Sequence, residues 1–158
     1  MLVVSVVVFS LYSPVARAQD EPTISLIAPG DVAGWALSPE GAQPKTQIGT
    51  LHVTVSGNLT GSWTVTATDN DAANTDGHMT RYNGNNGSYQ TGVRLAAPLY
   101  VKGPANDNPL PLPSGGVLVT GNTTVNQNYD ITFRQNIAWT DPVGDYRIVV
   151  TFTGSIVP

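Results

Sequence analysis

The stretch 69–77 holds the densest group of side chains that can bind a metal ion. It contains Asp69, Asp71 and Asp76, and carboxylates of this kind are ligands that Ca²⁺ prefers. These three residues are therefore the candidate metal ligands, and Ca²⁺ is the candidate cofactor. The spacing departs from the helix-loop-helix calcium motif, which requires Gly at the loop position where this stretch has Asn74. The competing interpretation is a turn whose Asp and Asn side chains accept hydrogen bonds from their own backbone.

The chain offers little else for catalysis. Its two histidines, His52 and His78, have no Ser and acidic residue arranged near them in the sequence as a hydrolase triad requires. The lack of Cys excludes disulfide bonds, thiolate zinc sites and cysteine nucleophiles. A net charge of −4 without a basic cluster argues against nucleic-acid binding. We therefore predict a protein that is not an enzyme and that has no cofactor besides the candidate Ca²⁺.

Three Asn residues match the acceptor sequence for N-linked glycosylation, in which Ser or Thr follows two positions later. They are Asn58, Asn86 and Asn122, and each lies in a stretch predicted to be a loop or turn. In a secreted chain such positions are accessible to a glycosylating enzyme, so the protein is a candidate glycoprotein. Their use depends on the source organism, because a typical bacterium would leave them unmodified.

The amino terminus has the pattern of a secretory signal peptide. The chain is almost wholly apolar from Leu2 to Leu11, a Ser-Pro pair follows, and Ala16 and Ala18 are small residues where a signal peptidase needs them. We predict a signal peptide over residues 1–18 and a secreted protein, extracellular or at the cell surface, of residues 19–158. The apolar run is shorter than the about 20 residues of a membrane span, so we predict no membrane span in the mature chain. The competing interpretation is a buried amino-terminal strand.

Several segments have apolar residues at every second position, which is typical of β-strands with one buried face. The clearest are 51–56, 63–68 and 146–153. Only 11% of the residues are charged, against roughly 25% in an average soluble domain, while Thr, Asn, Gly and Pro are abundant. We predict an all-β fold with a single antiparallel β-sandwich, immunoglobulin-like or jelly-roll-like, of about eight strands in residues 19–158. Further strands are expected at 23–27, 32–37, 99–102, 117–120 and 129–139.

Turn residues between the strands predict which strands pair. A loop rich in Gly and Asn separates 51–56 from 63–68, so these two segments are expected to form an antiparallel hairpin. The sequence Asp-Pro-Val-Gly, which begins at Asp141, is typical of a tight turn. It is expected to join 129–139 to 146–153 as a second hairpin.

Two stretches between the strands are expected to be surface excursions that bury little. The stretch 69–92 is rich in Asn, Asp and Gly, and the stretch 103–116 contains four Pro residues. The core, by contrast, is expected to form from apolar side chains on the alternating segments. Its predicted members are Trp35, Trp63, Tyr146, Ile148, Val150 and Phe152.

Short segments resemble known surface domains. The segment Gly61-Ser62-Trp63-Thr64-Val65-Thr66-Ala67-Thr68 and the tripeptide in Gly34-Trp35-Ala36-Leu37 are similar to motifs of the WxL-like cell-surface domains. The pattern Asp-Pro-x-Gly-x-Tyr at 141–146, followed by an alternating strand, resembles the last hairpin of many immunoglobulin-like surface modules. The resemblance implies a secreted β-sandwich that attaches to cell walls.

These features favour a structural or adhesive module of the cell surface without catalytic activity, whose partners are cell-surface or envelope components. The first alternative is a subunit of an extracellular filament or pilus, a homopolymer assembled by addition of the amino-terminal strand, in which Ile24 and Leu26 would set the register. The second alternative is a carbohydrate-binding module, with Trp139, Tyr82 or Tyr89 as stacking rings.

Overall fold

The computed structural model of the protein describes residues 2–8, 20–30, 35–113 and 116–158. The fold is a β-sandwich of two sheets, with 52% of the chain in strands and 3% in helix. This confirms the predicted fold class. The strands are β1 (Leu2–Val8), β2 (Thr23–Ile27), β3 (Lys45–Ser56), β4 (Ser62–Asp69), β5 (Thr80–Asn83), β6 (Ser88–Arg94), β7 (Tyr100–Lys102), β8 (Leu110–Pro111), β9 (Val117–Gly121), β10 (Val125–Gln135) and β11 (Tyr146–Val157), and the helix is α1 (Ala72–Thr75).

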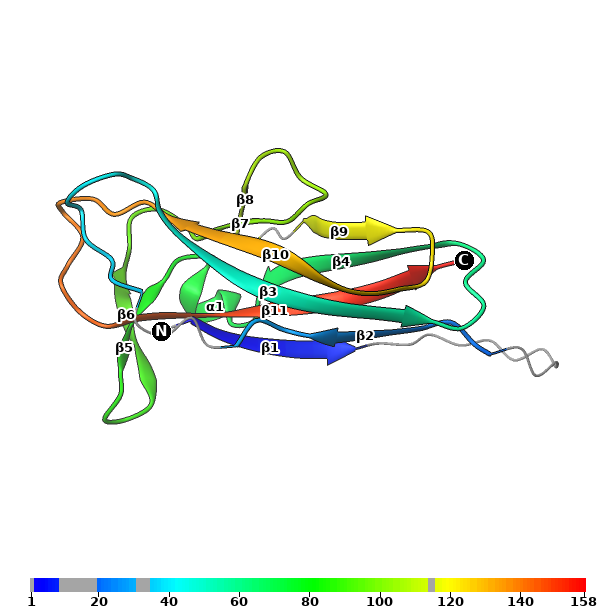
Figure 1. The fold of residues 1–158 in the computed structure, drawn as a ribbon. Coiled ribbons are helices and arrows are strands. Elements are labelled where there is room, and N and C mark those ends of the chain that lie inside the picture. Colours follow the sequence, from blue (N-terminus) through cyan, green and yellow to red (C-terminus); the bar gives the residue numbers. More distant parts are fainter. Residues whose placement is uncertain (1, 9–19, 31–34, 114–115) are drawn as a thin grey trace.

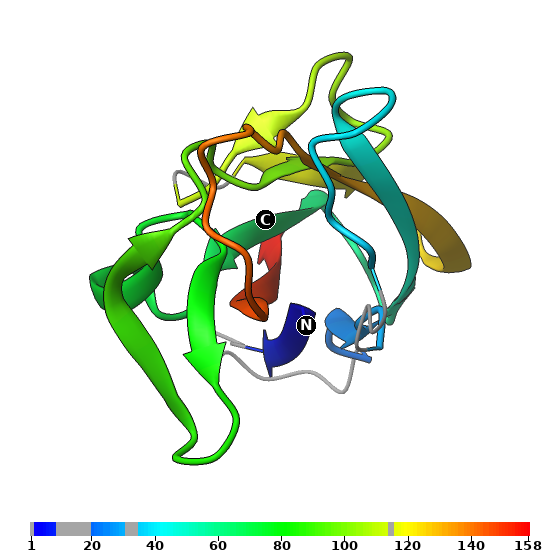
Figure 2. The ribbon, with the colours of Figure 1, turned by 90° about the vertical axis from the view of Figure 1, so that its left-hand side faces the viewer.

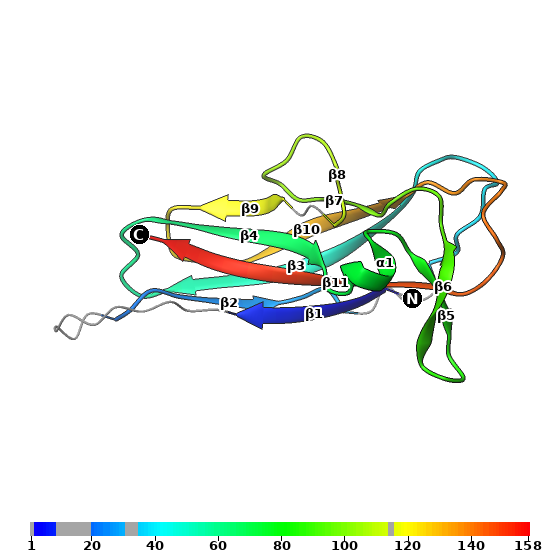
Figure 3. The same cartoon turned by 180° about the vertical axis from the view of Figure 1, so that it is seen from behind.

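The two sheets lie face to face and have different strand orders (Figures 1 and 3). The first sheet has the order β6-β5-β11-β4-β9, and β1 pairs with β11 beside this path. The second sheet has the order β2-β3-β10-β7-β8. The β1–β11 pairing is parallel, and the other pairings of the described strands are antiparallel.

Alternation in the sequence explains how the long strands form the core. On β3, Leu51, Val53 and Val55 are buried while the residues between them face outward. The same pattern buries Trp63, Val65 and Ala67 on β4. Because successive side chains of a strand point to opposite faces, each strand offers one apolar face to the opposite sheet. The predicted core residues Trp63, Tyr146, Ile148, Val150 and Phe152 are buried, and Trp35 is half-buried against the same core.

Both predicted hairpins are wrong, although their strands exist. The strands β3 and β4 lie in different sheets, and so do β10 and β11. Each of these strands has one apolar face. Two consecutive strands can bury these faces equally well whether they lie in opposite sheets or next to each other in one sheet. The intervening loops therefore cross from one sheet to the other instead of forming tight turns.

The strand count differs from the predicted eight because polar stretches also form strands. The stretch 69–92 contains α1, β5 and most of β6, and it buries Thr75, Met79 and Thr80. The stretch 103–116 contains β8. Backbone pairing with a neighbouring strand does not require an alternating apolar pattern, so sequence periodicity missed these strands. The predicted strand 32–37 lies partly outside the described residues, and its described part, 35–37, is not a strand.

The two ends of the sandwich differ in character. At one end, which we call the loop end, lie the β5–β6 turn (84–87), the β10–β11 loop (136–145) and the segment 38–44 (Figure 2). The carboxyl terminus and the β9–β10 turn lie at the opposite end, which we call the far end (Figure 1). Among the described residues, none belongs to a helix of the length and apolar character needed to cross a membrane.

Replacing Trp63 by Ala should lower the free energy of unfolding by about 3 to 5 kcal/mol, because the ring is only 2% exposed and leaves a large cavity. Its indole N–H also donates a hydrogen bond to the carbonyl of Thr123, at 2.9 Å. Urea denaturation followed by circular dichroism measures the change. The matched control is Trp139→Ala, since Trp139 is 77% exposed and should change stability by about 0.5 kcal/mol or less. Equal effects of the two substitutions would contradict the assigned core.

Candidate functional site

The carboxylate of Asp69 organises its own loop. Asp69 is buried, and its Oδ2 accepts hydrogen bonds from the hydroxyl of Thr75, at 2.5 Å, and from the backbone N–H of Gly77, at 2.7 Å. Its Oδ1 accepts a hydrogen bond from the backbone N–H of Asp71, at 3.0 Å. Both oxygens therefore serve as acceptors within the loop, as in the competing interpretation of this stretch.

The other two candidate metal ligands have partners of their own. The carboxylate of Asp71 accepts hydrogen bonds from the side-chain amide of Asn74, at 2.8 and 2.9 Å. Asp76 forms an exposed ion pair with Arg94, at 3.3 Å. In the described part of the chain, no three His, Cys, Asp or Glu side chains are placed to hold a metal ion. The structure does not bring Asp69, Asp71 and Asp76 together around one point, because the loop turns these carboxylates toward different partners, and the calcium site stays a prediction from the sequence.

The two histidines lie apart and contact polar groups unrelated to a triad. His52 is on the outer face of β3, where its Nδ1 is 2.7 Å from Oδ1 of Asn128 on the neighbouring β10. The Nδ1 of His78 is 2.8 Å from the backbone carbonyl of Leu95. Neither of these two contacts involves a Ser hydroxyl or a carboxylate.

The candidate glycosylation residues are exposed and lie in turns. Asn58 follows β3, and Asn122 follows β9. Asn86 lies in the β5–β6 turn at the loop end, where its side-chain oxygen accepts hydrogen bonds from Ser88. All three side chains are accessible to an enzyme.

The candidate assembly residues lie inside the chain's own sandwich. Ile24 and Leu26 are 7% and 6% exposed, and β2, which carries them, pairs antiparallel with β3. Ile24 packs against β11, because a Cβ added at Gly154 would lie 2.9 Å from its side chain. The strand that the filament alternative would donate to a neighbouring copy is thus paired within its own sheet.

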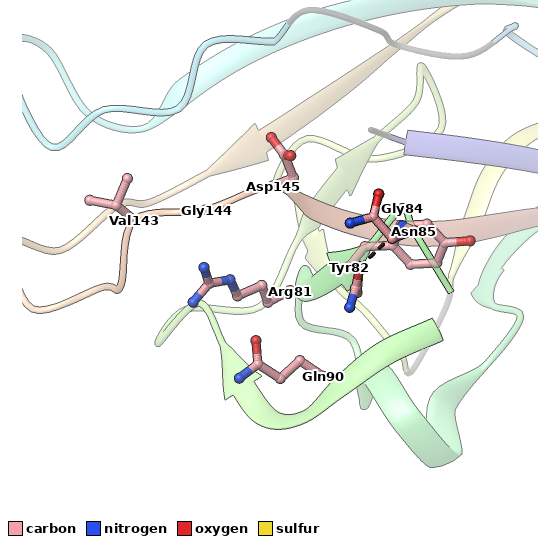
Figure 4. A pocket seen from close by; sticks show the side chains of 9 residues that line it. Arg81, Tyr82, Gly84, Asn85, Gln90, Val143, Gly144 and Asp145 are labelled. Atoms are coloured by element: carbon pink, nitrogen blue, oxygen red, sulfur yellow. Dashed lines mark hydrogen bonds between the residues drawn. The ribbon is translucent and has the colours of Figure 1, made fainter. Parts of the chain in front are cut away.

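A cavity of about 650 Å³ opens at the loop end (Figure 4). The β5–β6 hairpin and the β10–β11 loop supply its walls. Most of its side chains are polar, and Val143 is its single aliphatic one. The lining residues are Arg81, Tyr82, Asn83, Gly84, Asn85, Gln90, Val143, Gly144 and Asp145.

Aromatic and cationic side chains anchor the hairpin wall of the cavity. The guanidinium of Arg147 lies over the ring of Tyr82, 3.5 Å from its centroid, which is cation–π geometry. Tyr82 meets Tyr89 edge to face, with 5.5 Å between ring centroids. Burial is the largest cause that raises the pKa of Tyr89, and the negative charge of Asp71 adds to it. These contacts tie β5 and β6 to β11.

Hydrogen bonds fix the loop that forms the second wall. Asp141 accepts them from the backbone N–H groups of Ala96, at 2.9 Å, and Ala138, at 2.8 Å. The hydroxyl of Tyr146 donates to the carbonyl of Pro142, and burial raises the pKa of that hydroxyl. Within this held loop, Trp139 is 77% exposed and Val143 is 94% exposed.

The three candidate stacking rings therefore differ in availability. Tyr82 and Tyr89 are half-buried and contact each other, whereas Trp139 presents its ring to solvent. Sequence analysis did not single out Arg81, Gln90 or Val143. Each lies in a stretch predicted as a loop or turn, and only the pairing of β5 with β11 brings these stretches together.

Comparison with models of protein families gives no match, and no curated protein matches the sequence at a significant level. The similarity to WxL-like and immunoglobulin-like surface domains therefore rests on the short segments that suggested it.

Replacing Asp69 by Ala should lower the free energy of unfolding by about 1 to 3 kcal/mol, because Thr75 and Gly77 lose their buried acceptor. The loss should be equal in calcium and in chelator when thermal unfolding is measured. As a control, Asp76→Asn removes only an exposed ion pair, worth about 1 kcal/mol at most. If Ca²⁺ stabilised the wild-type protein but not the Asp69→Ala variant, the result would support a calcium site in this loop.

Proposed function

We propose that the protein is a secreted, non-catalytic structural and adhesive module of the cell surface that binds its partner through the loop end. One observation carries this proposal: Trp139 and Val143 are exposed on a loop held by hydrogen bonds, beside a polar cavity. Exposed aromatic side chains on ordered loops are typical of recognition surfaces. A held loop also loses little conformational entropy when it binds, which favours affinity.

The outer surface of the second sheet supports a module that remains hydrated. His52 and Thr54 of β3 stand beside Asn128 and Asn126 of β10, and hydrogen bonds link these side chains across the strands. Such a face exposes hydroxyl, imidazole and amide groups in place of an apolar patch. It supports a role in which the sheets act as a scaffold and the loops make contact.

The candidate glycosylation residues are compatible with this arrangement. Asn122 lies in the β9–β10 turn at the far end, so a glycan there would leave the loop end open. Asn86 is adjacent to Asn85, which lines the cavity. A glycan at Asn86 would therefore stand beside the proposed binding surface.

Replacing both Trp139 and Val143 by Ser should weaken binding to cell-envelope fragments of the source organism by tenfold or more, because the exposed apolar contact is lost. Sedimentation of the mature chain with washed envelope fragments measures this binding. The control is Val157→Ser, because Val157 is also an exposed apolar residue, at 53%, but it is the last residue of β11, near the far end. Unchanged binding of the double variant would contradict an adhesive loop end.

A specific observation favours a second candidate function, a subunit of an extracellular filament. The strand β11 pairs with β4 along one edge. Along its other edge, in the described part of the chain, the residues from Ile148 to Gly154 pair with β1 alone. The strand β1 falls within the predicted signal peptide, so its removal would leave this edge open. An open edge in the middle of a sheet is a template for a strand of another molecule. The donor would have to differ from β2, which already pairs with β3.

Light scattering of the mature chain from Gln19 tests the second candidate. The comparison is a version extended at its carboxyl end by a two-residue turn and a seven-residue apolar strand, which can fold back along β11. Assemblies of the mature chain that disappear in the extended version would support strand addition. Two monomers would contradict the filament and leave the adhesive module.

A further inference from the structure

We propose that the loop-end cavity binds an acidic glycan, with Arg81 contacting a carboxylate on a sugar ring. The inference rests on the proposed function, because it assigns a ligand class to the surface proposed there. It combines a positioned guanidinium, a set of amide side chains and an exposed aromatic ring within one end of the fold.

The backbone positions the Arg81 side chain at the cavity. Arg81 is half-buried on β5, where it is the register partner of Tyr146 on β11. The side chain passes close under the β10–β11 loop, because a Cβ added at Gly144 would lie 2.7 Å from its Nε. Glycine at position 144 thus makes room for the guanidinium. In Figure 4 the guanidinium of Arg81 lies between Gly144 and the amide of Gln90.

The charges around the cavity leave Arg81 available to a ligand. Arg94 is engaged with Asp76 and Arg147 with the ring of Tyr82, and Arg134, near the end of β10, is not part of the cavity lining. Among the described residues, Arg94–Asp76 is the single ion pair. A guanidinium in a cavity pairs well with a carboxylate, because its planar fork can donate two parallel hydrogen bonds.

The rest of the lining favours a monoanionic sugar over a phosphate. Asn83, Asn85 and Gln90 supply amide donors and acceptors, which suit ring hydroxyls. Asp145 also lines the cavity, so the lining carries one cation and one anion. A carboxylate at that position would repel a doubly charged phosphate, but it can accept hydrogen bonds from hydroxyls.

The dimensions and the neighbouring loop agree with a sugar ligand. The volume of about 650 Å³ lies within the range of cavities that hold small ligands. With Val143 as the only aliphatic side chain in the lining, the cavity does not suit an apolar ligand. Trp139, on the same loop as Val143 and Gly144, offers an exposed ring on which a second sugar of the chain can stack.

The test uses the full chain and three probes: oligosaccharides of galacturonate, glucuronate and mannuronate, each also as its neutral methyl ester. Isothermal titration calorimetry should show that at least one acid form binds at least tenfold more tightly than its ester. Arg81→Gln should abolish this preference, and Gly144→Ala should weaken it by displacing the same side chain. Arg94→Gln, which removes an exposed guanidinium outside the cavity lining, should keep it. Circular dichroism confirms that each variant is folded.

Two results would overturn the inference. One is that acid forms and esters bind equally, or that no probe binds. If the chain still sediments with envelope fragments through Trp139 and Val143 in that case, the proposed function stands without this ligand. The other is that Arg94→Gln removes the preference as fully as Arg81→Gln, which would reduce it to general charge attraction. If instead the variant with both Trp139 and Val143 replaced by Ser still bound envelope fragments as well as the wild type, the proposed function itself would be overturned.

Discussion

The fold depends on one constraint: each long strand has a single apolar face, and that face must meet the opposite sheet. Leu51 and Val53 of β3 satisfy it from one side, and Ile148 and Val150 of β11 satisfy it from the other. The consecutive strands β10 and β11 offer their apolar faces from different sheets, so the loop between them must cross the end of the sandwich. This crossing brings residues 136–145 beside the β5–β6 hairpin and forms the loop-end cavity.

Side-chain contacts hold the β10–β11 loop and the β5–β6 hairpin in place. Asp141 and Tyr146 hold the loop by hydrogen bonds to backbone groups, and Arg147 holds the hairpin through the ring of Tyr82. The exposed Trp139 is consequently carried by a loop with fixed anchor points. The same layout places the cavity at one end of the sandwich and the β9–β10 turn at the other (Figure 1).

The sequence predicts where the strands lie far better than which strands pair with each other. The alternation around Trp63 and Phe152 is visible because burial of one face imposes a period of two. Pairing is not visible, since a loop that crosses between sheets and a hairpin loop use the same Gly and Asn residues. The Asp-rich stretch at 69–77 looked like a metal site because residue types do not reveal that Asp69 accepts hydrogen bonds from Thr75 and Gly77. Arg81 was missed because its position depends on Gly144, far along the chain.

The loop-end cavity is tested most directly as a binding site by a map of where a ligand contacts the chain. Backbone amide chemical shifts of the ¹⁵N-labelled protein are followed by NMR while a uronate oligosaccharide is added. If the cavity binds the sugar, the largest shifts occur in the β5–β6 hairpin and the β10–β11 loop, at residues such as Arg81, Gln90 and Gly144. Shifts that spread over the outer faces of the sheets, or that gather at the far end, would contradict it.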